Sequence, residues 1–359
     1  MNKKGPILLA NFSAAWGGGE LWFLSVGRAL RAKGLDVHWW VKEGSVLEKK
    51  LAKLELPHFT TSGRASDMFS PSKVNNSIKA IKRIQPDLML LNASHELKFG
   101  GLMGKLAGVP NIIFRRGVSY PLSENAFNRW YIRNVTTGFL ANSNSTFQAF
   151  AHAFPNILNN VHTTIYNGIE LKPYGAVSSN PQDGLIIMSA RLSPEKGIDR
   201  ALLVMQKVKQ LYPQAHLRIL GDGPQRAALE QQAKALGLEQ HVTFAGFVDN
   251  VINELSKANL FLFTPTRGEG TSFALLEAMA CGLPCVAFES PSLDEVILHE
   301  QTGFLFPAEH MKEMAHSIHS LLTQADMRKT MGEASRTRAF SHFSLERLTD
   351  QFLTFYHSI

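Results

Sequence analysis

The chain has 359 residues, a length that favours two domains over one, and 45% of them are hydrophobic, which is enough for real cores and excludes a disordered protein. Its two cysteines exclude a disulfide framework, and no apolar run approaches the length of a membrane span. The net charge of +7 favours anionic partners. The first half carries this charge: residues 1–170 hold 20 Lys and Arg against 10 Asp and Glu, whereas residues 171–359 hold 17 Lys and Arg against 20 Asp and Glu.

This basic first half favours anionic lipid headgroups, nucleic acid or a phosphorylated substrate as partners, although solubility alone explains the charge equally well. Residues 1–4 are basic, like the start of a signal peptide. The apolar segment from Ile7 to Ala10, however, is too short for the hydrophobic region of a signal peptide. We therefore expect a cytoplasmic protein.

The first half alternates short apolar runs with helical segments, as parallel α/β sheets do. The glycine run at residues 17–19 follows the first strand, but it is not Gly-x-Gly-x-x-Gly and no acidic residue closes the second strand, so a dinucleotide-binding fold is not supported. We expect strands at residues 6–11, 36–41, 87–92, 111–114, 139–141 and 163–166, and helices at 20–33, 97–106 and around 130–134.

A break in the pattern separates two domains of similar size. Residues 171–183 contain two Pro, a Gly and a Ser-Ser-Asn run, which indicates a linker. The alternation then restarts and predicts a second α/β domain, with a site in the cleft between the two. We expect its strands at residues 185–189, 217–220, 242–244, 260–263 and 284–288, its helices at 198–211, up to 236 and at 273–281, and mostly helix from about 310.

The stretch 265–284 carries the clearest chemical signal. Ser272 is a plausible N-cap for a helix at 273–281 that is apolar on every side except for Glu277, and such a helix is buried. A buried carboxylate needs hydroxyls, a cation or backbone donors. Glu269 lies in the loop before the helix, and the free N–H groups between the two acids form a natural anion site. Neighbouring backbone alone could also satisfy Glu277.

A second loop supplies positive charge. Arg191 and Lys196 follow the strand at 185–189, at the carboxyl end where open α/β sheets bind ligands, and Gly197 permits close approach of a backbone. Arginine and lysine both suit phosphate oxygens, although basic loop residues are usually just solvated. With the helix N-terminus at 271–273 they suit a diphosphate, and Glu277 then suits the hydroxyls of a ribose.

With these residues in place, the second half resembles the donor-binding domain of retaining glycosyltransferases of family 4, which have the GT-B fold. The first half is similar more loosely, through residues 17–20, 94–95, 100, 104 and 141–143. The resemblance implies two Rossmann-like domains whose parallel sheets face each other across a cleft: an acceptor domain at 1–170, a linker at 171–183, a donor domain at 184–342, and a final helix at 343–359 that returns to the first domain. The matching segments of the second half are 167–170, 191 with 195–197, 221–224, 242–248, 269–270 through 277–280, 282 with 284, 295 and 302–304.

The resemblance also implies roles for single residues. Arg191 and Lys196 would hold the diphosphate and neutralise the departing charge without a metal or other cofactor, Glu269 would contact the transferred sugar, and Glu277 would bind the ribose. We take Arg191, Lys196 and Glu269 as catalytic. The remaining donor contacts would be Gly18, Gly19, Gly270, Thr271, Ser272 and Phe273, with Phe247 and Val248 beside the base.

One segment departs from the family pattern. Many relatives have a His before Gly at the strand matching residues 112–114, whereas this chain has Arg115-Arg116-Gly117. Arg116 stays protonated and cannot act as a general base, so we expect Arg115 and Arg116 to contact phosphate or an anionic acceptor. His95 is the nearby histidine that matches a family position, and it is a candidate for the same region, although a lone histidine is more often structural.

The family resemblance leads to a functional expectation. We expect a metal-independent retaining hexosyltransferase that takes its sugar from a nucleotide-diphospho-sugar, with UDP favoured, and acts on a surface glycan, lipopolysaccharide or lipid-linked acceptor, without a nucleic-acid partner. The aromatic and basic segment 120–133 would lie at an anionic membrane, at the inner face of the cytoplasmic membrane, or line the acceptor cleft; a helix with an aromatic core face is the alternative. A non-catalytic nucleotide-sugar-binding protein and a sugar-nucleotide epimerase on the same fold are the alternative functions.

Overall fold

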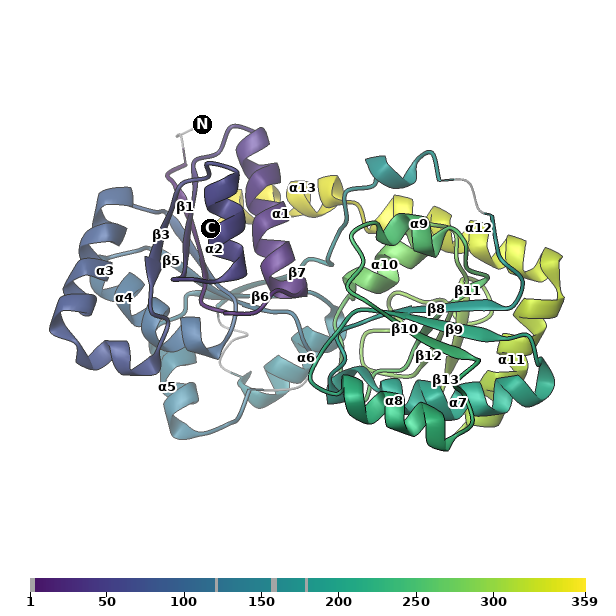
Figure 1. Ribbon diagram of the computed structural model, residues 1–359. Helices are drawn as coiled ribbons and strands as arrows, with labels where there is room; N and C mark the ends of the chain where they lie inside the picture. The colour runs from purple at the N-terminus through teal and green to yellow at the C-terminus, as the bar shows by residue number, and fades with distance from the viewer. Residues whose placement is uncertain (1–3, 120–121, 156–159, 178–179) are drawn as a thin grey trace. The chain divides into compact units, whose positions relative to one another are not determined.

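The computed structural model describes residues 4–119, 122–155, 160–177 and 180–359. The chain forms two compact units (Figure 1). The first comprises Met1–Asn167 together with Leu345–Ile359, and the second comprises Gly168–Ser344. The division falls close to the predicted linker, but residues 171–177 belong to the second unit and contain a short 3-10 helix, η4 (Lys172–Tyr174). Each unit is described by itself below.

The first unit is built on a parallel sheet, which within the described residues has seven strands in the order β3-β2-β1-β4-β5-β6-β7. The register pairs Leu9 of β1 with Trp39 of β2 on one side and with Leu90 of β4 on the other. The strands are β1 (Ile7–Asn11), β2 (Val37–Lys42), β3 (His58–Thr61), β4 (Leu88–Leu91), β5 (Asn111–Arg116), β6 (Gly138–Ala141) and β7 (Val161–Thr164).

Helices cover both faces of this sheet. Successive strand residues point to opposite faces, so neighbouring residues contact different helices. Trp39 donates through Nε1 to the backbone oxygen of Phe23 on α1, at 3.0 Å, whereas the adjacent Trp40 belongs to an apolar cluster with α3, α4, α5 and α6. Helix α2 contacts α1. The helices of this part of the chain are α1 (Gly18–Ala32), α2 (Val46–Lys53), the 3-10 helix η1 (Ala65–Phe69), α3 (Pro71–Ile84), the π-helix η2 (Glu96–Gly100), α4 (Gly101–Ala107), α5 (Ala126–Asn134) and α6 (Asn144–Ala153).

The last helix of the chain, α13 (Leu345–Ser358), belongs to the first unit. Phe352 packs edge-on against Trp22 of α1, with ring centroids 6.4 Å apart. The hydroxyl of Tyr356 donates to the backbone oxygen of Gly5 at 2.7 Å. These contacts hold α13 against α1 and against the segment that precedes β1.

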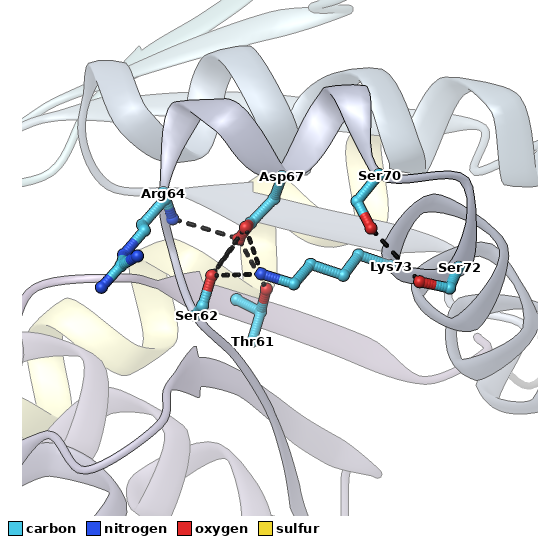
Figure 2. A network of polar contacts seen from close by, with 7 residues as sticks. All are labelled: Thr61, Ser62, Arg64, Asp67, Ser70, Ser72 and Lys73. Atoms are coloured by element: carbon cyan, nitrogen blue, oxygen red, sulfur yellow. Dashed lines mark hydrogen bonds and ion pairs between the residues drawn. The ribbon is translucent and has the colours of Figure 1, made fainter.

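Asp67 holds together the segment between β3 and α3 (Figure 2). Its carboxylate, 1% exposed, accepts from the Ser62 hydroxyl at 2.6 Å, from Lys73 Nζ at 2.7 Å and from the Arg64 backbone N–H at 3.1 Å. Burial alone would raise the pKa of Asp67, but Lys73 and Ser62 outweigh it and hold that pKa below its ordinary value. An ionised carboxylate therefore links β3 to α3.

The second unit repeats the architecture. Within the described residues its sheet has six parallel strands in the order β10-β9-β8-β11-β12-β13. The strands β8, β11 and β12 are almost entirely apolar and buried, as expected when helices cover both faces. The elements are β8 (Leu185–Ser189), η5 (Pro194–Lys196), α7 (Ile198–Leu211), β9 (His216–Leu220), α8 (Arg226–Ala235), β10 (Val242–Gly246), α9 (Val251–Leu255), β11 (Leu260–Phe263), α10 (Phe273–Ala280), β12 (Cys285–Phe288), β13 (Gly303–Phe306), α11 (Met311–Thr323) and α12 (Ala325–His342).

The predicted fold class, two parallel-sheet Rossmann-like α/β units, is confirmed. No helix or strand was predicted for α2, β3, α3, α6 or α9, and the segment of β13 was predicted only as part of a motif. Gly18 and Gly19, predicted in a loop, are the first residues of α1. Among the described residues, no helix is long and apolar enough to cross a membrane.

Candidate functional site

The loop after β8 is fixed against the loop after β11. Gly197 has φ = +63°, a left-handed conformation, and a Cβ at this position would lie 1.8 Å from the backbone oxygen of Thr264. The Thr264 hydroxyl donates to the Gly197 backbone oxygen at 2.8 Å. This close approach carries Arg191, which is exposed, and Lys196 to the carboxyl edge of the sheet.

An ion pair joins the two loops. Lys196 Nζ lies 2.6 Å from Oε1 of Glu269, and the two side chains are 23% and 17% exposed. Glu269 lies between β11 and α10, and its backbone N–H donates to the Ser290 hydroxyl at 3.4 Å. Two oppositely charged groups predicted from separate motifs therefore meet at one point.

A second carboxylate lies within the basic loop itself. Burial alone would raise the pKa of Glu195, but the Ser193 hydroxyl, 2.5 Å away, outweighs it together with the positive charges of Lys196 and Arg191. The pKa of Glu195 is therefore held below its ordinary value. The basic loop therefore also carries an ionised acid, whose bonded partner is the Ser193 hydroxyl.

The loops after β9 and β10 reach the same edge of the sheet. The Leu192 backbone N–H donates to the Asp222 oxygen at 3.1 Å, and the Gly221 N–H donates to the Gly246 oxygen at 2.7 Å. Phe247 follows directly and is 79% exposed, with Val248 beside it. An apolar, solvent-facing ring therefore stands on the edge that carries the charged loops.

Helix α10 begins at that edge and is buried as predicted. Ser272 precedes it with extended backbone, φ = −75° and ψ = 129°, and Thr271 is buried. The first N–H groups of a helix have no partner within it, so the start of α10 suits an anion. Gly270, Thr271, Ser272 and Phe273 all lie at this helix start.

Glu277, the lone charge of α10, finds its partner in the predicted linker. Tyr174 of η4 hydrogen-bonds to the Glu277 carboxylate. Burial raises the pKa of Glu277 to about 7, and the bond from Tyr174 opposes the shift. Burial and the Glu277 charge also raise the pKa of Tyr174. The tyrosine therefore stays protonated and orients the acid.

Arg336 of α12 hydrogen-bonds to both η4 and the end of α10. One of its nitrogens donates to the Tyr174 backbone oxygen at 2.7 Å and another to the Ala280 oxygen at 2.8 Å. Neither Tyr174 nor Arg336 was among the predicted site residues. A usable signal existed for Tyr174, since Glu277 was predicted to need hydroxyls and a tyrosine stood in the proposed linker.

In the first unit, four predicted residues lie where their strands end. Gly18 and Gly19 open α1 after β1, and Gly17 before them is fully extended. His95 is exposed at the start of η2, which follows β4. Arg116 ends β5 and is buried. All belong to the carboxyl edge of the first sheet.

Arg115 is a correction to the sequence analysis. The residue is 2% exposed, and its guanidinium stacks over the Trp22 ring at 4.2 Å while donating to Asn92 Oδ1 at 3.1 Å and to Asn167 Oδ1 at 3.0 Å. Burial lowers the pKa of Arg115 to about 9, opposed by the charge of Glu20. These contacts make Arg115 an interior residue of the first unit rather than a contact for phosphate or acceptor.

The structure thus sorts the predicted residues into two groups. The second unit gathers its group at the carboxyl edge of one sheet: Arg191, Lys196, Phe247, Val248, Glu269, Gly270, Thr271, Ser272, Phe273 and Glu277. The first unit places Gly18, Gly19, His95 and Arg116 at the corresponding edge of its own sheet. Within the described residues, no cluster of three or more His, Cys, Asp or Glu side chains suited to a metal ion is present.

Both halves of the chain match protein-family models. Residues 16–172 match the model described as Glycosyltransferase Family 4, and residues 176–338 match the model described as Glycosyl transferases group 1. Together the two models match most of both units and leave out residues 1–15 and 339–359 at the ends. The first match contains the glycines of α1, and the second contains the basic loop and both glutamates.

A solved structure shares the fold, and curated proteins are similar to part of the chain. HepE of Anabaena, solved in complex with UDP and glucose, superposes with a TM-score of 0.83 at 22% identity, over 99% of this chain and 100% of that one. The N-acetyl-alpha-D-glucosaminyl L-malate synthase of Bacillus anthracis is 34% identical over 40% of this chain. A GDP-mannose-dependent alpha-(1-6)-phosphatidylinositol monomannoside mannosyltransferase of Mycobacterium tuberculosis is 31% identical over 42%. The matches span only 38% and 41% of those two proteins.

Proposed function

The chain belongs to the GT-B glycosyltransferases of family 4, and we propose that it transfers a hexose from a nucleotide-diphospho-sugar to an acceptor hydroxyl with retention of configuration. The observation that carries this proposal is the Lys196–Glu269 pair, 2.6 Å apart at the start of α10, with Arg191 on the same loop. A cation for the phosphates and a carboxylate for sugar hydroxyls then stand side by side.

The donor is proposed to lie along the carboxyl edge of the second sheet. Its diphosphate would contact Arg191, Lys196 and the N–H groups at the start of α10, since such a helix end favours negative charge. Glu269, held by Lys196, would accept hydrogen bonds from the hydroxyls of the sugar. This assignment uses the charged groups that the structure brings together.

The nucleoside is proposed to lie further along the same edge. Glu277 would bind the ribose hydroxyls, with the Tyr174 hydroxyl orienting its carboxylate. The exposed Phe247 and its neighbour Val248 would border the base. We favour UDP because the structural neighbour HepE was solved with UDP; the mycobacterial relative is named for GDP-mannose, so GDP is the second candidate.

The proposed chemistry needs positive charge at the leaving group. As the bond between the anomeric carbon and the phosphate oxygen breaks, Arg191 and Lys196 would stabilise the charge that collects on the diphosphate. The acceptor oxygen bonds to the anomeric carbon on the same face, and its proton passes to the departing phosphate oxygen. We propose that these two side chains supply the charge stabilisation without a divalent cation.

The acceptor is proposed to be a growing surface glycan, a lipopolysaccharide or a lipid-linked sugar. The excess positive charge of residues 1–170 supports an anionic or membrane-bound acceptor. Gly18, Gly19, His95 and Arg116 are the candidate contacts from the first unit. We propose that transfer takes place at the inner face of the cytoplasmic membrane.

Turnover of a donor panel tests this function. The purified chain is incubated with UDP-, GDP- and ADP-hexoses, and release of the nucleoside diphosphate is measured with and without acceptor glycans. At least one donor should be consumed, and Lys196→Ala should lower kcat/KM by about 100-fold or more. Lys234→Ala removes an exposed lysine of α8 and serves as the matched control. Tight donor binding without turnover would favour the non-catalytic alternative, and a free epimer as product would favour the epimerase.

A further inference from the structure

Exposed apolar side chains lie on α4 and α5 of the first unit, and lysines of η2 and α4 contact α5. Leu106, Phe127 and Trp130 are 54%, 49% and 50% exposed. Phe127 and Trp130 lie three residues apart on α5, so they occupy neighbouring positions on one face of that helix. Large apolar side chains grouped on a surface mark a contact with a partner or a membrane.

The opposite face of α5 is an ordinary core face. Tyr131 and Ile132 are buried in the apolar cluster of the first unit. The Tyr131 ring supports both exposed rings, with centroids 4.8 Å from Phe127 and 5.1 Å from Trp130. The helix thus has its core face satisfied and still presents two aromatic rings to solvent. A core-face role accounts for Tyr131 but not for Phe127 or Trp130.

Two lysines contact α5. Lys98 Nζ lies 5.3 Å from the centroid of the Phe127 ring, and Lys105 Nζ donates to the backbone oxygen of Asn134 at the end of the helix. Leu106 follows Lys105 on α4. We call the group Lys98, Lys105, Leu106, Phe127 and Trp130 the α5 patch.

The charge around the α5 patch is strongly positive. Residues 64–134 contain eleven Lys and Arg against four Asp and Glu. Their difference, +7, equals the net charge of the whole chain. Of those four acids, Asp67 and Glu96 are 1% and 2% exposed. Arg115 and Arg116 are buried as well, so the exposed part of this segment keeps the same excess of positive charge.

We propose that the α5 patch docks the first unit onto a bilayer that contains anionic lipids. Trp130 and Phe127 enter the headgroup region, where amphipathic rings are favoured, and Lys98 and Lys105 meet the lipid phosphates. The inference rests on the proposed function in one respect: it supplies the surface on which a lipid-linked acceptor would be met.

The composition of the patch favours a bilayer over other anionic partners. A single-stranded nucleic acid would be bound by aromatic stacking along a basic groove. Leu106 is aliphatic and more than half exposed, so it can enter an apolar phase but cannot stack on a base. Within a bilayer interface all three apolar side chains contribute in the same way.

Vesicle flotation tests the proposal on the full chain. Vesicles of phosphatidylcholine, with or without about one third phosphatidylglycerol, are mixed with the protein at moderate salt, and the bound fraction is measured. The wild type should float with the anionic vesicles and far less with the neutral ones. Phe127→Ser with Trp130→Ser should lower the partition coefficient at least about tenfold. Lys98→Gln with Lys105→Gln should lower it about fivefold for each lysine.

A matched variant separates the patch from general positive charge. Lys49 and Lys53 are exposed on α2, which packs on α1 at the other face of the sheet. Charges beyond a screening length of about 10 Å from the bilayer contribute little. Lys49→Gln with Lys53→Gln should therefore change partitioning less than about twofold, although it removes the same charge.

The outcomes are distinguishable from failure of the proposed function, because donor turnover is measured without lipid. The proposal is overturned if the wild type ignores anionic vesicles, if the α5 variants float like the wild type, or if the α2 variant loses as much binding. Binding to nucleic acid or formation of a dimer through Trp130, without vesicle binding, also overturns it. Unchanged melting temperatures and donor turnover in the variants show that they fold.

Discussion

Glu277 is a single residue on which stability and the proposed function make opposite demands. Its helix is otherwise apolar, and burial raises the pKa of its carboxyl to about 7. Ionising an acid in such a place costs free energy, which the Tyr174 hydroxyl offsets only in part. In the proposed function the ribose hydroxyls supply the remaining hydrogen bonds.

This conflict predicts a pH-dependent gain in stability for Glu277→Gln. The folded-state pKa of about 7 lies above the ordinary value of 4.5, so the folded chain binds this proton more tightly than the unfolded chain does. Below pH 4.5 the group has no effect on folding, and above pH 7 its destabilising effect is complete. The variant should therefore gain more stability, relative to the wild type, at pH 8 than at pH 5.

Denaturant titration at the two pH values checks this prediction, with Glu239→Gln, an exposed acid after α8, as control. The same Glu277 variant should raise the KM for the donor, since an amide is a weaker acceptor for ribose hydroxyls. An equal stability change at both pH values would contradict the linkage. An unchanged KM would argue against the ribose role.

Arg115 and Tyr174 show why single residues resist prediction from sequence. Arginine after a strand looks like a ligand contact, and only the folded chain reveals that Trp22, Asn92 and Asn167 enclose this one. Tyr174 lies in the segment 171–183, which was predicted to be a linker because of its Pro and Gly residues. In both cases the deciding neighbours are distant in sequence, so no local pattern reports them.

At the scale of elements, apolar strands and glycine loops were predictable because their signals are local. The strands at 185–189 and 260–263 were predicted with their observed bounds. The segment from Val46 to Ile84 was passed over, since α2 and α3 are mostly polar with few buried positions. Weakly apolar helices on the outside of a sheet leave little periodic signal.

The loop between β8 and α7 depends on one glycine. Gly197→Ala would force a Cβ to within 1.8 Å of the Thr264 oxygen in a left-handed conformation. The loop must then shift, which moves Lys196 away from Glu269. We expect a loss of more than about 2 kcal/mol in the free energy of unfolding and a fall in kcat/KM.

Gly237→Ala provides the control for backbone strain. Gly237 has φ = +66°, close to that of Gly197, but the nearest atom to its Cβ position is Lys209 Nζ at 3.9 Å. The control should lose only about 1 kcal/mol and keep full activity. Equal losses in stability and activity in the two variants would show that contact with Thr264 does not hold the loop.

At the scale of the whole molecule, two units of the same architecture carry different charge. The excess of positive charge belongs to the first unit, which holds the α5 patch and the candidate acceptor contacts. The second unit concentrates its functional charges on one sheet edge, at the start of α10. In the proposed function, the second unit recognises the donor and the first unit attracts an anionic acceptor or bilayer.

The central claim is that the second unit binds a nucleoside diphosphate through Lys196, and a thermal-shift titration with UDP and GDP tests it most directly. A ligand at about a hundred times its dissociation constant should raise the melting temperature of the wild type by roughly 5–10 °C. The Lys234→Ala control should show the same rise, and Lys196→Ala should lose most of it. A shift that survives Lys196→Ala, or no shift with either nucleotide in the wild type, would contradict the account.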